Sequence, residues 1–435
     1  MIRFILVVFL PILFVSYPLQ SIDNNDTLTL SKAIEFALEN NTVIKEAINA
    51  REKAWYEYKS ANASRFPELL ASYSYTKLKD APVAVFSGME FTVGGEESYT
   101  YNVTIKQPLF TGYALKTRVK VAELGINIKD IEKKMAVLDV IKNVKIAYYN
   151  ILLAQKYLNI AHEEVTQLEA HLSDARSLYN EGIIAYNDLL KSEVALSYAS
   201  QNQRKSESNL KMAVSYLNIL LHQDIDKELI VEDILKLTPA KYELVSLINK
   251  AIKNRPEIKI IESYIKQSEL SAKLVKSSFY PQIFLFGTYK QTGDNFKATN
   301  YDFGRFYDSI IGVEAKWILF DWGKRKAEID KCQYDKLALQ EKVNSITDNI
   351  KLEVKDAYLN LSVAEDNISI AKKSLTQAEE NFRITNLQYQ QQATTSTEVI
   401  DARTFLTRAE MNYYNALYGY LISQAELERA TASEF

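Results

Sequence analysis

The 435-residue sequence is poor in the residues that interrupt helices. It contains only 12 glycines and 8 prolines, which are low numbers for a chain of this length. No proline occurs between Pro108 and Pro239, and none follows Pro281. Because helix-forming residues such as alanine, leucine, lysine and glutamate fill these stretches, the sequence predicts α-helices that are much longer than average.

Cysteine and excess charge are also scarce, and each absence excludes a class of protein. Cys332 is the single cysteine, so neither an internal disulfide nor a thiolate metal cluster can form. The formal net charge of −3 gives no electrostatic reason to expect nucleic-acid binding. The three histidines, His162, His171 and His222, lack the spacing of a helical metal pair and are expected on solvated helix faces. With no phosphate-binding glycine loop and no nucleophile elbow, we expect no enzyme, no cofactor and no metal site.

The N-terminus has the pattern of a secretory signal. Arg3 precedes an apolar run, Ile5–Val15, that is too short to span a bilayer. We predict a signal peptide over residues 1–21, with cleavage between Ser16 and Ser21. An uncleaved membrane anchor is the alternative. No later segment reaches the roughly 18 continuous apolar residues of a transmembrane helix.

The strongest positive feature is an internal repeat. The segment Val144–Asn150 returns as Val354–Asn360, a spacing of 210 residues, and Pro67 returns as Pro281, a spacing of 214. Self-similarity on this scale indicates duplication of a half-molecule. We therefore divide the mature chain into a first repeat over residues 22–221, a linker over 222–242 and a second repeat over 243–435.

Each half begins with a short helical region, over Leu30–Phe66 and Glu243–Phe279. Each half then contains two segments in which apolar and polar residues alternate, and a polar loop separates the two. In the clearest one, Tyr99–Lys106, every second residue is Tyr, Val or Ile and the others are Thr, Asn and Lys. The remaining segments are Ala71–Thr76, Ile283–Lys290 and Ile311–Trp317, and Phe284 and Phe286 interrupt the polar side of the third. A period of two predicts strands, and strands of about ten residues can cross a bilayer. Half-buried strands of a soluble sheet are the alternative, which the signal and the long helices disfavour.

Four strands are too few to close a membrane barrel. An open sheet in lipid leaves backbone groups unpaired at its edges, so we expect further copies of the chain to close it. Three copies give twelve strands, and two give eight. Long helices are predicted from about residue 111 to 180, 186 to 221, 322 to 389 and 397 to 429. Helices of this length are expected to pack side by side as coiled-coil-like pairs.

Candidate functional residues lie at the two turns between the long helices. Gly182 suits the left-handed conformation that often ends a helix. Asp188 and Glu398 are equivalent in the repeat and fall in the first turn of a helix, where the helix dipole favours negative charge. Helix capping is therefore one interpretation. Glu398 and Asp401 share a helix face, so in a symmetric trimer they would form rings of carboxylates, as in cation-selective pores.

The chain resembles the TolC-like outer-membrane efflux proteins over essentially its whole mature length. The resemblance is carried by the duplicated layout, by Gln107–Phe110 and its counterpart Trp317–Gly323 where a strand passes into a long helix, and by the two hairpin turns. It implies a mainly α protein with membrane β-structure. Four strands per chain would contribute to a twelve-stranded barrel in a homotrimer, and the duplicated helical hairpins would form a periplasmic α-barrel.

The resemblance also implies a function and a set of partners. The trimer would be the passive exit duct of a tripartite efflux or secretion system in the outer membrane, in contact with outer-membrane lipid, a periplasmic adaptor protein and an inner-membrane pump. The pump, rather than a wide water-filled lumen, would select the cargo. A type I protein secretion duct is one alternative. A secreted coiled-coil scaffold or adhesion stalk is another, although it explains neither the strands nor the signal.

Roles for individual residues follow from the resemblance. Tyr389 and Asp188 would help to lock the periplasmic aperture, Asp188 from the neighbouring helix pair, and Glu398 and Asp401 would form its acidic rings. The hairpin tips would dock the adaptor through Gly182, Ile183, Gln392 and Ala393. The chain departs from the family at the second tip. Thr394 stands where an arginine contributes to the lock, and Gln391–Ala393 lacks the usual glycine.

Overall fold

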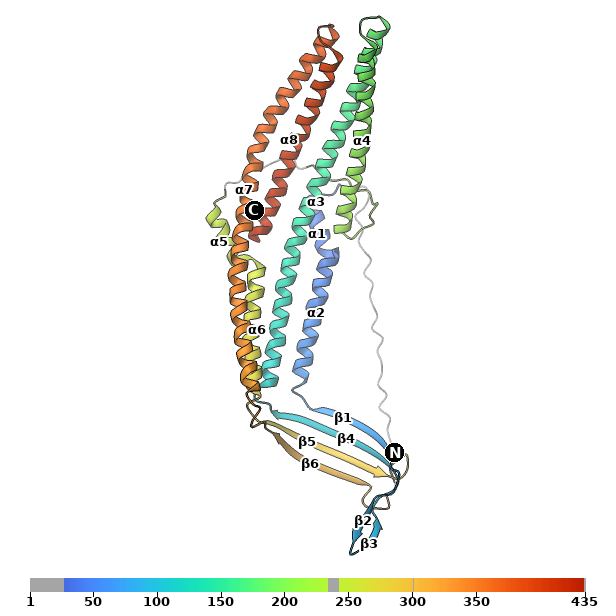
Figure 1. The fold of residues 1–435 in the computed structure, drawn as a ribbon, viewed down its shortest axis with the longest axis vertical. Helices are drawn as coiled ribbons and strands as arrows, with labels where there is room; N and C mark the ends of the chain where they lie inside the picture. Colours follow the sequence, from blue (N-terminus) through green and yellow to red (C-terminus); the bar gives the residue numbers. More distant parts are fainter. Residues whose placement is uncertain (1–26, 234–241, 300, 434–435) are drawn as a thin grey trace. The chain divides into compact units, whose positions relative to one another are not determined.

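The computed structural model describes residues 27–233, 242–299 and 301–433 (Figure 1). The predicted signal peptide, residues 1–21, and residues 234–241 of the predicted linker lie outside the described residues. Within the described residues, no helix is both long enough and apolar enough to cross a membrane.

The chain is mainly helical, with two long helical hairpins and a four-stranded sheet, so the predicted fold class is confirmed. The first half contains α1 (Leu30–Asn40), α2 (Thr42–Ala63), β1 (Glu68–Lys77), β4 (Glu97–Phe110), α3 (Ala114–Asn180) and α4 (Tyr186–Leu220). The second half contains α5 (Leu244–Asn254), α6 (Pro256–Ser277), β5 (Gln282–Gly293), β6 (Tyr307–Lys316), α7 (Lys324–Gln390) and α8 (Ser396–Thr431). At 1.5 Å per residue, the 67 residues of α3 and of α7 each extend about 100 Å.

Each short helical region is divided into two helices, whereas the sequence analysis predicted one. In the first half, the side chain of Asn41 accepts a hydrogen bond of 2.9 Å from the backbone N–H of Val43 and caps α2. In the second half, Arg255 lies at the equivalent break and Pro256 begins α6. Proline has no N–H to lose at the first helical position and has a helix-compatible φ. Two different sequences therefore produce the same break.

The four long strands form one antiparallel sheet in the order β1-β4-β5-β6, which leaves β1 and β6 as its edges (Figure 1). The predicted alternation places tyrosines together on one face, where the ring centroids of Tyr73 and Tyr101 lie 4.6 Å apart. The other face is mainly polar. There the hydroxyls of Thr104 and Thr288 lie 3.1 Å apart on neighbouring strands. The sheet thus has the two unlike faces that its sequence predicts.

The two phenylalanines that interrupt the polar face of β5 have partners on that face. Phe286 lies against Gly312 of β6, where an added Cβ would come within 2.7 Å of the ring. Phe284 lies beneath the ammonium group of Lys106, 4.3 Å from the ring centroid, and Lys106 also pairs with Glu314 at 3.1 Å. The glycine therefore leaves space for the Phe286 ring, and the lysine makes a cation–π contact with the Phe284 ring.

A second, small sheet occupies the segment between β1 and β4, which the sequence analysis treated as a polar loop. It consists of β2 (Val83–Phe86) and β3 (Met89–Thr92). Ser87 and Gly88 connect the strands with positive φ angles of 51° and 82°, as a two-residue hairpin turn requires. Apolar residues on both sides of a Ser-Gly pair were the signal for this hairpin, and the prediction of a loop was wrong here.

The chain forms two compact units, and each unit takes residues from both halves. The first, named here the tip unit, comprises the described parts of Met1–Glu39, Asn143–Thr238 and Asn367–Gly419. The second, named here the sheet unit, comprises those of Asn40–Lys142, Pro239–Asp366 and Tyr420–Phe435. Helices α3 and α7 contribute residues to both units.

Buried polar contacts tie the segments of each unit together. In the tip unit, the hydroxyl of Tyr148 lies 2.8 Å from the carbonyl oxygens of both Leu28 and Glu232, and burial raises the pKa of Tyr148 to about 12. In the sheet unit, the guanidinium of Arg255 donates to Glu353 and to the carbonyl oxygen of Ala430. These contacts join segments that are far apart in the sequence.

Candidate gate at the helical hairpin tips

Both long hairpins end in the same type of turn, which lies in the tip unit. At the first tip, the N–H of Gly182 donates to the carbonyl of Tyr179 at 2.9 Å, and the N–H of Ile183 donates to that of Leu178 at 2.9 Å. At the second tip, Gln392 donates to Tyr389 at 2.9 Å and Ala393 donates to Gln388 at 2.8 Å. This pair of bonds is the Schellman motif, which satisfies the last carbonyls of a helix.

The Schellman motif needs a left-handed residue, and the two tips supply it differently. Gly182 has φ of 74°, and an added Cβ would meet nothing within 4 Å. Gln392 has φ of 59° although it carries a side chain, a conformation that is unfavourable for residues other than glycine. The missing glycine therefore does not change the shape of the second tip. Gly182, Ile183, Gln392 and Ala393 are all exposed, and their role in adaptor docking stays a prediction.

The helices that follow the turns begin differently. Ala185 precedes α4 and offers no side-chain cap. Thr395 precedes α8, and its hydroxyl lies 3.4 Å from the backbone nitrogen of Glu398. Thr395 and Glu398 have the spacing of a capping box. The side chains of Glu398 and Asp401 are exposed and form no ion pair within the described chain, so helix capping and a carboxylate ring are both compatible with this geometry.

Asp188 lies next to a lysine that links the two hairpins. The Lys191 ammonium is 3.2 Å from Asp188 Oδ1 and donates at 3.1 Å to the hydroxyl of Thr397 on α8. Thr394, at the position of the family's arginine, makes no side-chain hydrogen bond in the described residues. Lys191 is thus a cationic link between the hairpins that the sequence analysis did not predict.

Tyr389 is buried between the two hairpins. Only 3% of its surface is exposed, and its ring centroid lies 4.7 Å from that of His171 on α3. In the described structure its hydroxyl is buried and meets no partner with full hydrogen-bond geometry, although an interaction with the Ser396 hydroxyl opposes the effect of burial on its pKa. Burial raises the pKa of Tyr389. Its predicted contact with Asp188 of a neighbouring helix pair stays a prediction about the assembled protein.

His171 is buried, and the prediction that it is solvated was wrong. It is 5% exposed, and its Nε2 lies 2.7 Å from the hydroxyl oxygen of Ser396 on α8. The Ser396 oxygen is in turn 2.9 Å from that of Ser192 on α4, whose hydroxyl donates to the carbonyl of Asp188 at 3.1 Å. Burial lowers the pKa of His171. Three helices therefore meet at one buried polar cluster.

The sequence did contain a signal for the burial of His171. Leu168, Leu172 and Ala175 are buried beside it on α3, at the spacings that place residues on one helix face. A histidine within an apolar stripe is a candidate for burial, but its neighbours on α4 and α8 depend on packing between distant segments.

A second buried polar contact between α3 and α8 lies seven residues farther from the hairpin tips on each helix. Arg403 on α8 is 1% exposed, and its guanidinium is 3.5 Å from Glu410. Glu164 on α3 interacts electrostatically with Arg403. Burial raises the pKa values of both Glu164 and Glu410, although Arg403 opposes these shifts.

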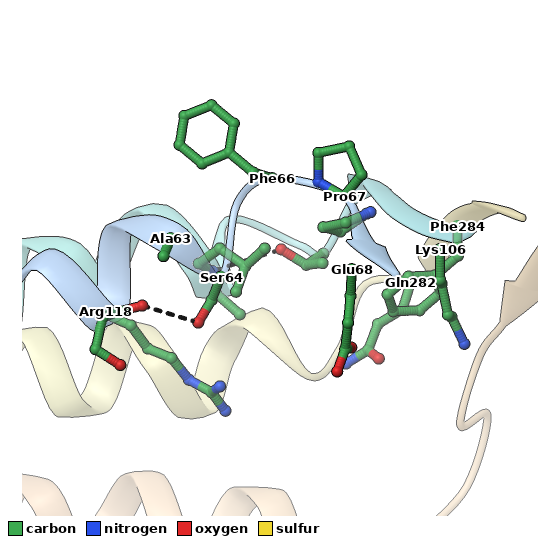
Figure 2. Close-up of a pocket in the computed structure, with 14 residues that line it drawn as sticks. Ala63, Ser64, Phe66, Pro67, Glu68, Lys106, Arg118, Gln282 and Phe284 are labelled. Atoms are coloured by element: carbon green, nitrogen blue, oxygen red, sulfur yellow. Dashed lines mark hydrogen bonds between the residues drawn. The ribbon is translucent and has the colours of Figure 1, made fainter. Parts of the chain in front are cut away.

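The sheet unit contains a separate open pocket of about 720 Å³ where α2, α3 and the sheet meet (Figure 2). Figure 2 shows Arg118 on the helical side and Glu68 and Lys106 on the strand side. Glu68 and Arg118 are exposed, and Lys106 is partly buried. The pocket is a charged, solvated surface next to the polar face of the sheet. Among the described residues, no cluster of His, Cys, Asp or Glu side chains could hold a metal ion.

The sequence profile of one protein family, described as "Outer membrane efflux protein", matches residues 33–221 and 247–433. The chain is 19% identical over 319 residues to the outer membrane protein TolC of Escherichia coli, an alignment that covers 71% of this chain and 64% of TolC. It is 23% identical over 350 residues to the toxin and drug export protein A of Aggregatibacter actinomycetemcomitans, covering 79% and 73% of the two chains. The matched region therefore spans less than two thirds of the length of TolC.

Solved structures share the fold. The Campylobacter jejuni CmeC outer membrane channel superposes with a TM-score of 0.80 at 17% identity, covering 95% of this chain and 88% of that one. The outer membrane protein VceC of Vibrio cholerae superposes with a TM-score of 0.76 at 16% identity, covering 93% and 96%. At these identities the likeness concerns the fold.

Proposed function

Because this chain belongs to the outer membrane efflux protein family, we propose that it is one subunit of a passive exit duct in the outer membrane. The duct conducts substrates from a periplasmic pump–adaptor complex to the exterior and performs no chemistry. A periplasmic adaptor protein and an inner-membrane pump are its partners, and the pump supplies the energy. The family match disfavours a secreted scaffold or adhesion stalk, while small-molecule efflux and type I protein secretion both fit this duct.

One observation carries the proposal: an open four-stranded sheet with one apolar face is joined to two long helical hairpins in the same chain. Within the described residues, the edge strands β1 and β6 have no partner on their outer sides. Lipid cannot satisfy the backbone groups of an open edge, so β6 of one subunit pairs with β1 of the next. Three copies of the sheet give twelve strands, enough to enclose a water-filled lumen lined by the polar face.

The repeat organisation then assigns the parts of the duct. The signal peptide over residues 1–21 directs export, the repeats over 22–221 and 243–435 each supply two strands and one helical hairpin, and residues 222–242 link them. The segments 79–98 and 292–308 face the exterior, and the hairpin tips face the periplasm. Tags inserted in these segments should be accessible on intact cells, and tags at Gly182 should not. The opposite accessibility would invert the topology.

The hairpin tips form the periplasmic gate in this proposal. Asp188 and Tyr389 hold the helix pairs together, and Glu398 and Asp401 from three subunits form stacked acidic rings at the constriction. The exposure of both ring carboxylates supports this arrangement, because groups that line an aqueous pore must be free to meet water. The exposed tips around Gly182, Ile183, Gln392 and Ala393 dock the adaptor.

Assembly and conduction test the proposed function directly. The purified protein in mild detergent should have the mass of a trimer and should form ion-conducting channels in planar bilayers. A monomer that retains the strand signal of the sheet, or a trimer that does not conduct, would contradict the proposal.

The acidic rings predict a selective channel. Replacing Glu398 and Asp401 together by alanine should reduce cation selectivity and remove block by multivalent cations added from the periplasmic side, because converging carboxylates attract cations. If these groups only cap a helix, the variant should lose about 0.5–2 kcal/mol of stability and conduct as the parent does. Glu169→Ala is the matched control, because it removes an exposed carboxylate of α3 that lies outside the proposed rings and the proposed lock.

A further inference from the structure

The tip unit contains an interface between α3 and α8 in which two polar contacts flank an apolar layer. His171 meets Ser396 at one level, and Glu164 interacts with Arg403 at the other. The two levels are seven residues, or about two helical turns, apart on each helix. Buried apolar residues fill the space between them: Leu168, Val399 and Ala402. This interface and the contacts of α4 with α8 hold the tip of the α7–α8 hairpin against the tip of the α3–α4 hairpin.

The cluster around His171 suits a neutral imidazole only. Nε2 has the Ser396 hydroxyl as its partner, while Nδ1 is buried without a partner in the described structure. Because the Ser192 hydroxyl donates to the Asp188 carbonyl, the Ser396 hydroxyl donates to Ser192 and accepts from the Nε2–H of His171. A protonated imidazole carries an N–H at both positions. It would leave one buried donor unpaired and one charge desolvated, and both are unfavourable.

Among the described residues, no charged group forms an ion pair with His171 that would compensate this loss. On α3, Asp174 acts on His171 electrostatically without a hydrogen bond to it. On α4, the carboxylate of Asp188 is engaged by Lys191. On α7 the facing group is the uncharged Tyr389. On α8 it is the hydroxyl of Ser396, while Glu398 is exposed and Arg403 belongs to the next level.

We propose that His171 is a proton-operated latch of the gate: the neutral ring holds the α7–α8 tip against α3 and α4, and its protonation releases that tip. The inference rests on the proposed function, because it assumes that separation of the two hairpins opens the duct. It adds a regulation of that site, namely opening in response to acid on the periplasmic side.

The direction of the pH effect follows from proton linkage. The released tip exposes His171, which then titrates near the ordinary histidine value of about 6.5, whereas the closed tip excludes the proton. The contribution of His171 to the closed state is therefore complete above about pH 6.5 and is lost as the pH falls below it. Each pH unit below that value multiplies the ratio of open to closed subunits by up to about tenfold.

Glu164 and Glu410 act in the opposite direction. Burial raises their pKa values, so they bind protons more readily in the packed state and acid favours packing at this level. A pH response of the parent protein alone therefore does not identify His171. The test needs a variant that removes this histidine and a control that removes a different one.

The experiment measures open probability in planar bilayers as the periplasmic side is acidified from about pH 7.5 to about pH 5.5. The parent channel should open at least about threefold more often at the lower pH, and the His171→Gln variant should respond little. His162→Gln is the matched control on the same helix, because His162 is exposed and contacts Gln203 at 3.0 Å. It should respond as the parent does. A parent without acid activation, or a His171→Gln variant that keeps it, would overturn the latch.

A second variant tests the same inference without altering the histidine. The hydroxyl oxygens of Ser192 and Ser396 are 2.9 Å apart, so cysteines at both positions are close enough to form a disulfide across the latch. In a Cys332→Ser background, the oxidised Ser192→Cys, Ser396→Cys protein should lose acid activation. Reduction should restore it, because the thiol at position 396 can still accept from the Nε2–H of His171 while Nδ1 stays without a partner. Acid activation that persists with the disulfide formed would exclude release of this tip. A parent protein that does not conduct at any pH would instead contradict the proposed function.

Discussion

The turn between α3 and α4 and the turn between α7 and α8 close with the same pair of backbone hydrogen bonds, yet they lie in different surroundings. Tyr179 in the first turn is 38% exposed and contacts Tyr186 of its own hairpin. Tyr389, its equivalent 210 residues later, is buried against His171 of the other hairpin. Duplication thus preserved the local turn, while packing between the hairpins gave the two tyrosines different roles.

The two tips also differ in how the first helix ends and how the second helix begins. The first tip has a glycine at its left-handed position but no capping side chain before α4. The second tip has the unfavourable Gln392 at that position but a threonine before α8. Each tip therefore combines one favourable helix end with one unfavourable end, and substitutions can exchange these features.

The largest difference is expected from the two tyrosines. Tyr389→Ala should destabilise the packing of the second tip by about 3 kcal/mol, because it removes a buried aromatic ring and leaves a cavity. Tyr179→Ala should cost less than about 1 kcal/mol, because its ring is largely solvated. Hydrogen–deuterium exchange of the tip peptides measures both effects. Equal changes at the two tips would contradict the difference in environment.

Tyr389→Phe separates the ring from its hydroxyl. In the described part of one subunit the buried hydroxyl makes no hydrogen bond of full geometry and its polar neighbour is the Ser396 hydroxyl, so its loss should leave hydrogen exchange at the tip close to that of the parent. If the hydroxyl bonds to Asp188 of a neighbouring subunit, as the family resemblance implies, the same variant should raise the open probability without changing selectivity.

The left-handed positions should respond with opposite signs. Gly182→Ala should destabilise the first tip by about 1 kcal/mol through backbone strain, since a Cβ meets no steric obstacle there. Gln392→Gly should stabilise the second tip by up to about 1 kcal/mol. The comparison can be read from exchange rates of the turn amides, and a loss of stability in both variants would contradict it.

The helix starts should give the smallest effects. Thr395→Ala should destabilise the start of α8 by about 0.5 kcal/mol, at the low end for a lost cap because its contact of 3.4 Å is long. Ala185→Ser should stabilise the start of α4 by a similar amount, since Asp188 then completes a capping pattern. Opposite shifts in the exchange of the first-turn amides would support both assignments, and unchanged exchange would refute them.

Much of the fold could be predicted because its signals are local and periodic. The scarcity of glycine and proline predicted the long helices, and the alternation around Tyr99–Lys106 predicted both strand and face. The positions of Gly182, Asp188 and Glu398 at the hairpin turns were also predictable from the repeat. The hairpin around Ser87 was missed because its strands are only four residues each, too short for a clear period.

The sequence by itself determined the duplicated plan, the helix and strand periods and the turn residues, because each depends on neighbours along the chain. Only the tertiary structure decided that His171 is buried, that Ser192 and Ser396 share its cluster, and that Lys191 joins the two hairpins. These contacts connect residues about 200 positions apart in different helices. Repeat symmetry cannot assign them, because a buried cluster between two repeats uses different residues from each of them.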